Sequence, residues 1–344
     1  MRIVIDSFTV SKGGGVAVHI INLLNNFSER NEIIVLIKRD EDSSLFNAKK
    51  NVSFKKMPFY NKFTRLLYEQ ILIPLYAFYI KADAIYLPKQ YAPILRTAKI
   101  VTTVHDFIPD KKSGGESLCA RIYWKLQYNL IKMKSDNLIF YTKEAALKYK
   151  KRFRNLSKKR YAIIQNGFDS YSRRENQKQK YILIPSTLKK RKNIETAVEL
   201  GLMIRKNFPD KTIAVIGRTD LKVIEKRIKE KNENVEFLGF VSRDKAEELF
   251  NDAFAVLYLS SDEGFGLPIA EAISLDKMVV AADNKLNKSI YKDMPIYYNL
   301  QKTVEENSDS IIEKLKKGAH YEEKKRTWSQ AGKETELFLE SILR

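Results

Sequence analysis

Runs of apolar residues alternate with longer polar segments along the whole chain. The runs are rich in β-branched and aliphatic side chains, and the segments between them repeat apolar residues at helical spacing. Because nearly every position of a run is apolar, each run is typical of a parallel strand covered on both faces. The pattern predicts strands at residues 2–6, 33–37, 84–87, 100–104, 138–141, 161–164, 181–184, 212–216, 235–238, 253–259 and 278–282.

The alternation is interrupted once, by the polar stretch "SYSRRENQKQK" at residues 170–180. A chain of 344 residues exceeds the length that one hydrophobic core usually serves, so two domains with a cleft between them are expected. We predict an α/β fold made of an amino-terminal domain, a linker, a second domain and a terminal helical segment, at residues 1–168, 169–180, 181–322 and 323–344.

The chain carries 62 Lys and Arg against 42 Asp and Glu, a net charge of +20. Such a charge attracts nucleic acid, anionic lipid headgroups or phosphorylated small molecules. The sequence has no zinc-finger spacing, no aromatic RNA-binding strand and no helix-turn-helix pattern, so nucleic acid is not expected as a partner. From charge alone, a basic protein that binds nucleic acid or membrane without catalysis stays open as an alternative.

Other features indicate the compartment. Cys119 is the single cysteine, which excludes an intrachain disulfide and a cysteine-rich zinc site and favours a reducing compartment. The first residues, "MRIVID", are typical of a strand and not of a signal peptide. The uncharged stretch at 71–80 is shorter than the ~20 residues that span a bilayer. We therefore expect a cytoplasmic protein.

The stretch "SSDEGFGLPIAEAISL" at residues 260–275 places Glu263 and Glu271 around a glycine turn that follows a predicted strand. Its second half has helical spacing, with Pro268 as the predicted first helical residue. The N–H groups and dipole at a helix amino terminus attract anions, and glycines let a phosphate approach. We expect the dipole to keep Glu271 ionised, so that it accepts hydrogen bonds from a ribose diol, and we expect Glu263 to face the group beyond the phosphates.

Two further loops carry candidate phosphate contacts. The glycines at residues 13–15 follow the first strand and open a helix, as contact with a phosphate or a sugar requires. The basic run "LKKRKN" is expected to bring Lys192 and Arg191 to a phosphate, while Lys189 and Lys190 face solvent.

The histidines and one acidic pair complete the candidates. His105 ends an apolar strand and is expected to face the cleft, whereas His19 and His320 are interpreted as ordinary residues. Asp40 and Asp42 form the Asp-x-Asp spacing by which a one-domain GT-A enzyme holds a metal ion. The order of motifs in this chain does not fit that class, so both acids are interpreted as part of a polar loop.

The order of these motifs resembles that of retaining GT-B glycosyltransferases, in particular glycosyltransferase family four. "EGFGLPIAE" resembles the E-x7-E signature of that family, and "STLKKRKNIETAVEL" resembles its basic clamp. "DSFTVSKGGGVAVHIINLL", "VTTVHDFIPD" and "IIQNGFD" resemble its glycine-rich loop, its His-Asp segment and its interdomain segment. "TWSQAGKETELF" resembles the terminal helix that crosses back to the first domain in the family.

The resemblance implies two Rossmann-like domains with parallel sheets that face a central cleft. The donor would bind mainly on the second domain and the acceptor on the first. Catalysis would involve His105, Glu263, Lys192 and Arg191, with the two cations on the donor diphosphate. No metal and no cofactor are implied, because the nucleotide sugar is a substrate. The implied donor-binding residues are Gly14, Gly15, Phe240, Val241, Gly264, Phe265, Gly266, Leu267 and Glu271.

The resulting hypothesis is a retaining, metal-independent hexosyltransferase of surface polysaccharide synthesis. It moves a hexose from a nucleotide-diphosphate sugar, GDP-mannose ahead of the UDP-hexoses, to a glycan or lipid-linked saccharide. A sugar-nucleotide epimerase of similar architecture is the alternative within enzymes. The segment at 59–81 is predicted to form a core helix bent at Pro74, with a basic, tyrosine-rich part that can rest on anionic lipid. We therefore expect a peripheral position at the inner face of the membrane.

Overall fold

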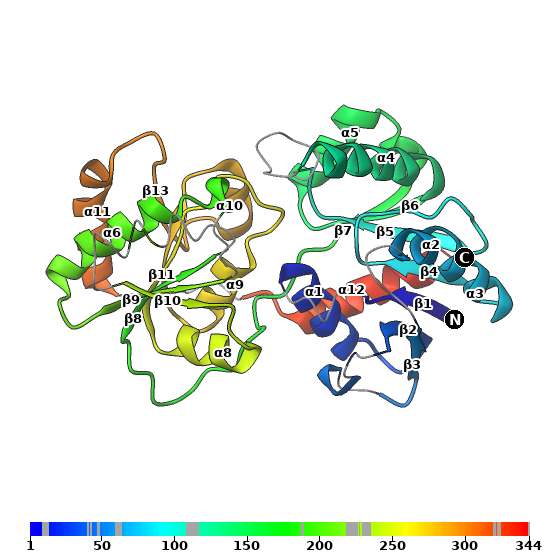
Figure 1. Ribbon diagram of the computed structural model, residues 1–344, viewed down its shortest axis with the longest axis horizontal. Helices are drawn as coiled ribbons and strands as arrows, with labels where there is room; N and C mark the ends of the chain where they lie inside the picture. The colour runs from blue at the N-terminus through cyan, green and yellow to red at the C-terminus, as the bar shows by residue number, and fades with distance from the viewer. Residues whose placement is uncertain are drawn as a thin grey trace. The chain divides into compact units, whose positions relative to one another are not determined.

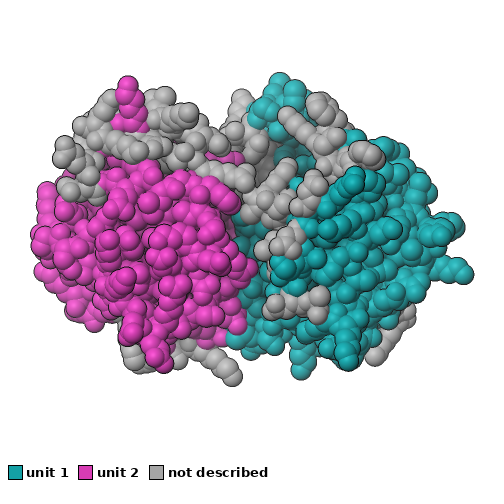
Figure 2. Space-filling view, turned by 60° about the horizontal axis from the view of Figure 1, so that its bottom comes forward, with its two compact units in different colours: residues 1–112, 116–167, 326–344 teal, residues 113–115, 168–325 magenta. Residues whose placement is uncertain are grey.

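The structure is a computed structural model of the chain. It describes residues 1–8, 14–39, 41, 43–46, 49–58, 64–107, 117–186, 189–217, 226, 228, 235–318, 321 and 325–342. These residues form two compact units, coloured separately in Figure 2. Unit 1 contains the described residues up to 167 together with 326–342, and unit 2 contains the described residues from 168 to 325.

Unit 1 is built on a sheet of seven parallel strands in the order β3-β2-β1-β4-β5-β6-β7 (Figure 1). Ile3 pairs with Ile33 on one side and with Ala84 on the other, so β1 lies near the centre. The central strands are buried on both faces, as their continuous apolar runs predict. The strands are β1 (Arg2–Asp6), β2 (Glu32–Lys38), β3 (Val52–Met57), β4 (Ala84–Leu87), β5 (Lys99–Val104), β6 (Asn137–Phe140) and β7 (Arg160–Ile163).

The helices α3, α4 and α5 of unit 1 cover one face of this sheet. Ile85 and Ile100 pack in one cluster with Ile73 of α3, and Val104 packs in another with Tyr128 of α4. Since Ile100 and Val104 lie an even number of residues apart on β5, their side chains share a face. The helical elements of unit 1 are α1 (Gly15–Asn25), η2 (Ser43–Leu45), α2 (Arg65–Leu67), the π-helical turn η3 (Tyr68–Leu72), α3 (Ile73–Tyr79), α4 (Leu118–Lys134), α5 (Lys143–Phe153), η5 (Leu156–Lys158) and α12 (Trp328–Ser341).

The terminal helix α12 packs against α1 within unit 1. A Cβ on Gly332 would lie 2.8 Å from the carbonyl oxygen of Asn26, so only glycine permits this close approach. Glu336 of α12 accepts hydrogen bonds from the Ser28 backbone N–H at 2.7 Å and from its hydroxyl at 2.9 Å. These contacts attach the end of the chain to the amino-terminal sheet.

Unit 2 contains six parallel strands in the order β10-β9-β8-β11-β12-β13 (Figure 1). The two parallel sheets with their helices confirm the predicted α/β class. The strands are β8 (Tyr181–Pro185), β9 (Thr212–Ile216), β10 (Val235–Gly239), β11 (Ala253–Tyr258), β12 (Met278–Ala282) and β13 (Ile296–Tyr298). The helical elements of the described part of unit 2 include η6 (Lys190–Lys192), α6 (Ile194–Asn207), α8 (Arg243–Asn251), α9 (Leu267–Ser274), α10 (Lys285–Tyr291) and α11 (Val304–Lys317).

The strands β3 and β13 were not predicted, and both lie at a sheet edge. β3 reads VSFKKM and leaves alternate side chains exposed, so its sequence lacks the continuous apolar run of a central strand. The stretch at 169–180, predicted as a linker, lies in unit 2 and is bonded to it. The Arg174 backbone N–H donates to Asn251 Oδ1 at 2.9 Å, and that of Lys178 to Asp252 Oδ1 at 3.1 Å.

The segment predicted as a core helix is buried on one face only. Ile73, Pro74 and Ala77 are buried, whereas Leu75 and Phe78 are exposed. Residues 59–63, at the start of that segment, lie outside the described residues. Within the described part of the chain, we find no helix with the length and apolarity that crossing a bilayer requires.

Candidate functional site

In unit 2, Glu263 lies in the loop between β11 and α9 and binds two basic side chains. Its Oε1 accepts a hydrogen bond from Arg191 Nη1 at 2.7 Å, and Lys192 Nζ and the Ser260 hydroxyl donate to the same oxygen. Arg191 and Lys192 lie in η6, just after β8. Because β8 and β11 are parallel neighbours, the loops at their carboxyl ends meet, and the structure brings these predicted residues together.

The side chains of this cluster are largely withdrawn from water, with 18% of Arg191, 9% of Lys192 and 14% of Glu263 exposed. Burial by itself raises the pKa of Glu263, but the charges of Lys192 and Arg191 outweigh it and hold the pKa below its usual value. Burial lowers the pKa of Lys192, while Glu263 opposes that shift. The three groups form one coupled unit with more positive than negative charge.

Tyr258, the last residue of β11, contacts Lys192 of this cluster. Its hydroxyl accepts a hydrogen bond from Lys192 Nζ at 2.6 Å, and the ammonium lies 4.7 Å from the ring centroid. Asn193 adopts a left-handed conformation with φ of 50° and donates from Nδ2 to the Leu259 carbonyl at 2.8 Å. The end of η6 is thus bonded through a side chain to the residue that follows β11, which fixes both cations.

Tyr291 hydrogen-bonds the glycine turn at residues 264–266, which follows this cluster. Its hydroxyl lies 2.9 Å from the carbonyl oxygen of Phe265 and 3.0 Å from that of Gly266. Gly266 has φ of 86° and precedes the first residue of α9, Leu267. Pro268 is therefore the second helical residue and not the first, which corrects the predicted start. Gly264 completes the turn, so the predicted phosphate loop does open a helix.

Glu271 is buried inside α9, with 5% of its surface exposed. Burial raises the pKa of its carboxyl to about 7, although the nearby Arg243 acts in the opposite direction. Near pH 7 the carboxylate is therefore only partly ionised, because desolvation favours its protonated form and opposes the ionisation expected from the helix dipole. No hydrogen bond from a described side chain or backbone group reaches this carboxylate.

Phe240 and Val241 lie between β10 and Arg243 at the start of α8. The Phe240 side chain is 62% exposed and that of Val241 is partly buried. Arg243 donates to the Ser170 carbonyl at 2.9 Å and is electrostatically coupled to Glu271. This coupling puts the β10–α8 loop on the same side of unit 2 as Glu271.

In unit 1, His105 follows β5 and is held by its neighbours. Its Nε2 lies 2.6 Å from the carbonyl oxygen of Pro88, which can only accept, so Nε2 carries the proton and Nδ1 is an acceptor. Burial lowers the pKa of His105 to about 4, although the Pro88 hydrogen bond acts in the opposite direction. Gln90 Oε1 accepts from the backbone N–H groups of His105 and Asp106 at 2.9 and 3.1 Å.

His19, interpreted from sequence as an ordinary residue, lies beside His105 with ring centroids 6.1 Å apart. Its Nδ1 lies 2.9 Å from Asn166 Oδ1, within the "QNGFD" segment. Burial and the neighbouring His105 lower the pKa of His19 to about 3. Both imidazoles are neutral near pH 7. Gly14 and Gly15, at the start of α1, are exposed, and Gly14 has φ of 86°.

Other predicted residues lie outside the described ones: Gly13, Asp40, Asp42 and His320. Among the residues that the structure does describe, no group of three His, Cys, Asp or Glu side chains is arranged to hold a metal ion.

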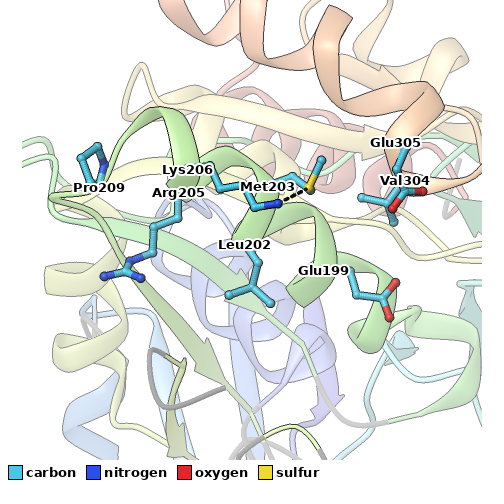
Figure 3. A pocket seen from close by; sticks show the side chains of 8 residues that line it. All are labelled: Glu199, Leu202, Met203, Arg205, Lys206, Pro209, Val304 and Glu305. Carbon is cyan, nitrogen blue, oxygen red and sulfur yellow. Dashed lines mark hydrogen bonds between the residues drawn. The ribbon is translucent and has the colours of Figure 1, made fainter. Parts of the chain in front are cut away.

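Two hollows lie along α6 in unit 2. One, of about 490 Å³, borders the ion-paired cluster through Asn193 and Ser261. The other, of about 610 Å³, lies farther along the helix and is shown in Figure 3. Its lining holds none of the predicted site residues, and consists of Glu199, Leu202, Met203, Arg205, Lys206, Pro209, Val304 and Glu305.

Two family models match the chain. Residues 167–335 match the model of the glycosyl transferases group 1, and residues 13–171 match that of glycosyltransferase family 4. The chain belongs to these glycosyltransferases. The family resemblance that the motifs indicated is thereby confirmed.

This glycosyltransferase is also similar to a named mannosyltransferase. The O-antigen chain mannosyltransferase RfbU of Salmonella typhimurium is 26% identical over 216 residues, which is 60% of this chain and 58% of RfbU. The match thus spans little more than half of that relative.

Solved structures establish the fold. A structure of Anabaena Alr3699/HepE in complex with UDP and glucose is 14% identical, covers 99% of this chain and 100% of its own, and has a TM-score of 0.67. The structure of WaaG, a glycosyltransferase of lipopolysaccharide biosynthesis, is 13% identical with coverages of 98% and 99% and a TM-score of 0.70. The predicted GT-B fold is confirmed.

Sequence reasoning missed several residues that hold the candidate site residues within each unit. Tyr258 and Tyr291 are hidden within apolar strand and helix patterns, and nothing in their spacing marks them. Gln90 lies in the loop after β4 without a motif. His19 did carry a signal, since a histidine on the helix that follows the glycine loop is buried on the side of the sheet's carboxyl edge.

Proposed function

We propose that this protein is a retaining, metal-independent hexosyltransferase that uses a nucleotide-diphosphate sugar. The observation that carries the proposal is the buried Glu263 cluster beside the amino terminus of α9, with the unbonded, buried carboxylate of Glu271 one turn further on. A diphosphate fits the two cations and the first turn of α9. A ribose diol fits a buried carboxylate that has hydrogen-bonding capacity left.

In this proposal, the transition state is stabilised by charge. As the bond from sugar to diphosphate breaks, negative charge grows on the departing phosphate, and Lys192 and Arg191 stabilise it together with the N–H groups of the Gly264–Leu267 turn. The acceptor attacks the same face, and the departing phosphate oxygen takes its proton. His105 hydrogen-bonds the sugar through Nδ1, and Glu263 lies near the reacting carbon.

The donor-binding set under this proposal includes the residues of the glycine loop and of the β10–α8 loop. We assign the donor to residues 181–322 and the acceptor to residues 1–168, with 169–180 as linker and 323–344 as the segment that returns to the amino-terminal sheet. The donor-binding residues are Gly14, Gly15, Phe240, Val241, Gly264, Phe265, Gly266, Leu267 and Glu271.

The relatives guide the choice of substrates. RfbU is named as a mannosyltransferase, which supports GDP-mannose as the first donor to test, and the HepE structure holds UDP, which makes UDP-hexoses the second. RfbU and WaaG are named for O-antigen and lipopolysaccharide, which supports a glycan or lipid-linked saccharide acceptor of surface polysaccharide synthesis at an anionic membrane surface. We place the protein at the cytoplasmic face of that membrane.

A panel of nucleotide sugars, incubated with and without extracted lipid acceptors, tests the proposal through release of the nucleotide. We expect release from one donor, strongly increased by an acceptor, and persisting in EDTA. An acceptor-independent conversion of the nucleotide sugar would indicate the epimerase. Binding of lipid or nucleic acid with no turnover of any donor would indicate a non-catalytic protein.

A further inference from the structure

Two neighbouring helices of unit 1 carry stripes of exposed apolar side chains. In the continuous helix α2–η3–α3 the exposed apolar positions are Leu66 (50%), Leu67 (47%), Ile71 (39%), Leu75 (48%), Phe78 (69%) and Tyr79 (83%). From Leu67 onward, steps of three and four residues place them on one side of the helix. The opposite side, with Ile73 and Ala77, is buried against the sheet.

The helix α4 has a second stripe of the same kind. Its exposed apolar side chains are Leu118 (65%), Ile122 (51%), Leu126 (59%) and Met133 (67%). Tyr128 and Ile131, on its other side, are buried against the sheet. Most of the strongly exposed large apolar side chains of the described residues lie on these two helices and on the adjacent Ile94 and Leu95.

The two stripes belong to one surface. Both helices pack on the same face of the seven-stranded sheet, so their exposed sides both lie away from that face. Arg65 Nη2 donates to the Tyr123 hydroxyl at 3.3 Å, and that hydroxyl donates to Glu69 Oε2 at 3.2 Å, which joins α2 and η3 directly to α4. We call the exposed sides of α2–η3–α3 and α4 the apolar face.

The charges that the two helices expose are positive. Helix α4 contains Arg121, Lys125, Lys132 and Lys134 and no acidic residue. In α2–η3–α3 the single acid, Glu69, is buried and paired with Arg65 at 2.8 Å. A surface of apolar side chains edged by lysine and arginine complements the headgroup region of an anionic bilayer, which offers both apolar depth and negative charge.

We propose that the apolar face docks this protein on an anionic membrane by shallow insertion of both stripes. The proposal rests on the proposed function in one respect: a lipid-linked acceptor lies at such a surface. It goes beyond attraction by net charge, because it assigns the contact to two helices and adds an apolar component. Exposed apolar surface of this extent on one face otherwise disfavours solubility.

Vesicle sedimentation of the full chain tests the proposal. Phosphatidylcholine vesicles with and without phosphatidylglycerol serve as probes, at ~0.1 M and ~1 M salt. Two double variants remove apolar groups, I122S with L126S on α4 and L75S with F78S on α3. The matched control is L238S with L337S, which removes two exposed leucines from β10 and α12 (38% and 46% exposed).

We expect the wild type to bind the anionic vesicles and to keep part of that binding at high salt. Each double variant should weaken binding at least tenfold, and the control should bind as the wild type does. The charge variant K125Q with K132Q should weaken binding at low salt more than K316Q with K317Q on α11 does. Equal losses in the apolar variants and in their control would overturn the proposal.

A second outcome would also overturn it. If the apolar variants abolish a concentration-dependent dimer in ultracentrifugation while wild-type binding to vesicles is absent, the apolar face is covered by a second copy of the chain. Donor binding by calorimetry separates the two proposals, because the apolar face holds no donor-binding residue. Variants that lose vesicles but keep the donor would support both, and vesicle binding without any donor binding would refute only the proposed function.

Discussion

Arg191 and Glu263 form a buried ion pair, with Nη1 2.7 Å from Oε1. Lys192 binds the same oxygen, so one carboxylate is shared by two cations and a net positive charge remains. The substitution Glu263→Gln leaves both cations without a charged partner, and we expect it to lower the free energy of unfolding by about 3 kcal/mol, the lower end for removal of one buried partner.

A nucleoside diphosphate should raise the melting temperature of this variant more than that of the wild type, because its charge replaces the lost carboxylate. Differential scanning fluorimetry measures both effects. Glu305→Gln, at an exposed acid on α11, is the control. A variant as stable as the wild type would show that the ion pair has little energetic importance.

Lys192→Ala should reduce kcat more than it reduces donor affinity, because its charge is used most when the diphosphate leaves. Steady-state kinetics together with calorimetry of the nucleoside diphosphate separate the two. Lys190→Ala changes an exposed lysine of the same turn and should leave both unchanged. Loss of affinity with an unaltered kcat would contradict this role.

Glu271 should make stability depend on pH. Its pKa is raised from 4.5 to about 7 in the folded protein, so the folded state holds the proton more tightly than the unfolded chain. The stabilisation is full below pH 4.5 and is lost as the pH rises to about 7. Glu271→Gln removes this loss. In urea unfolding, the free energy of unfolding of the variant relative to that of the wild type should therefore increase by on the order of 3 kcal/mol between pH 4 and 8.

The same residue should make donor affinity depend on pH in the opposite sense. The ionised carboxylate accepts the ribose hydroxyls, so affinity for a nucleotide sugar should rise up to about pH 7 and then level off. Glu271→Ala should cost about 1.5 to 3 kcal/mol of affinity. Calorimetry of wild type and Glu271→Gln at several pH values checks both, and an unchanged affinity would remove Glu271 from the site.

Gln90 should act as a positioning residue for His105. Its Oε1 accepts from two successive backbone N–H groups, and its Nε2 donates to the Tyr128 hydroxyl at 3.2 Å. Gln90→Met should misplace the imidazole and lower kcat by about tenfold, which corresponds to ~1.4 kcal/mol of activation free energy. It should also shift the His105 ring signals in NMR spectra. Gln90→Glu keeps the acceptor and should recover much of both. Native ring signals in the Met variant would exclude this role.

The product should keep the anomeric configuration of the donor. Inversion needs a general base, for which His105, Asp106 and Glu263 are the available groups. The retaining scheme needs none, so His105→Ala should slow transfer without abolishing it. Proton NMR of the product's anomeric signal measures the outcome directly. A β linkage from an α-linked donor would refute retention and make one of those three groups the base.

The sequence by itself determined the central strands, because strands buried on both faces must be apolar at almost every position. It also determined the order of the motifs at the carboxyl ends of those strands, where glycines and paired charges are readily seen. The edge strand β3 escaped prediction because alternate side chains meet solvent and several of them are polar. The edge strand β13 escaped because its three residues are too few to stand out as an apolar run.

Only the tertiary structure decided which groups are buried together. The raised pKa of Glu271 comes from desolvation by neighbours distant in sequence, which the local helix dipole does not reveal. The joint hold of Arg191 and Lys192 on Glu263, and of Gln90 on the His105 backbone, depends on loops that meet only when parallel strands pair. The exposed stripes of α3 and α4 are likewise evident only in the structure, where the opposite side of each helix packs on the sheet. The spacing of apolar residues alone does not distinguish a buried face from an exposed one.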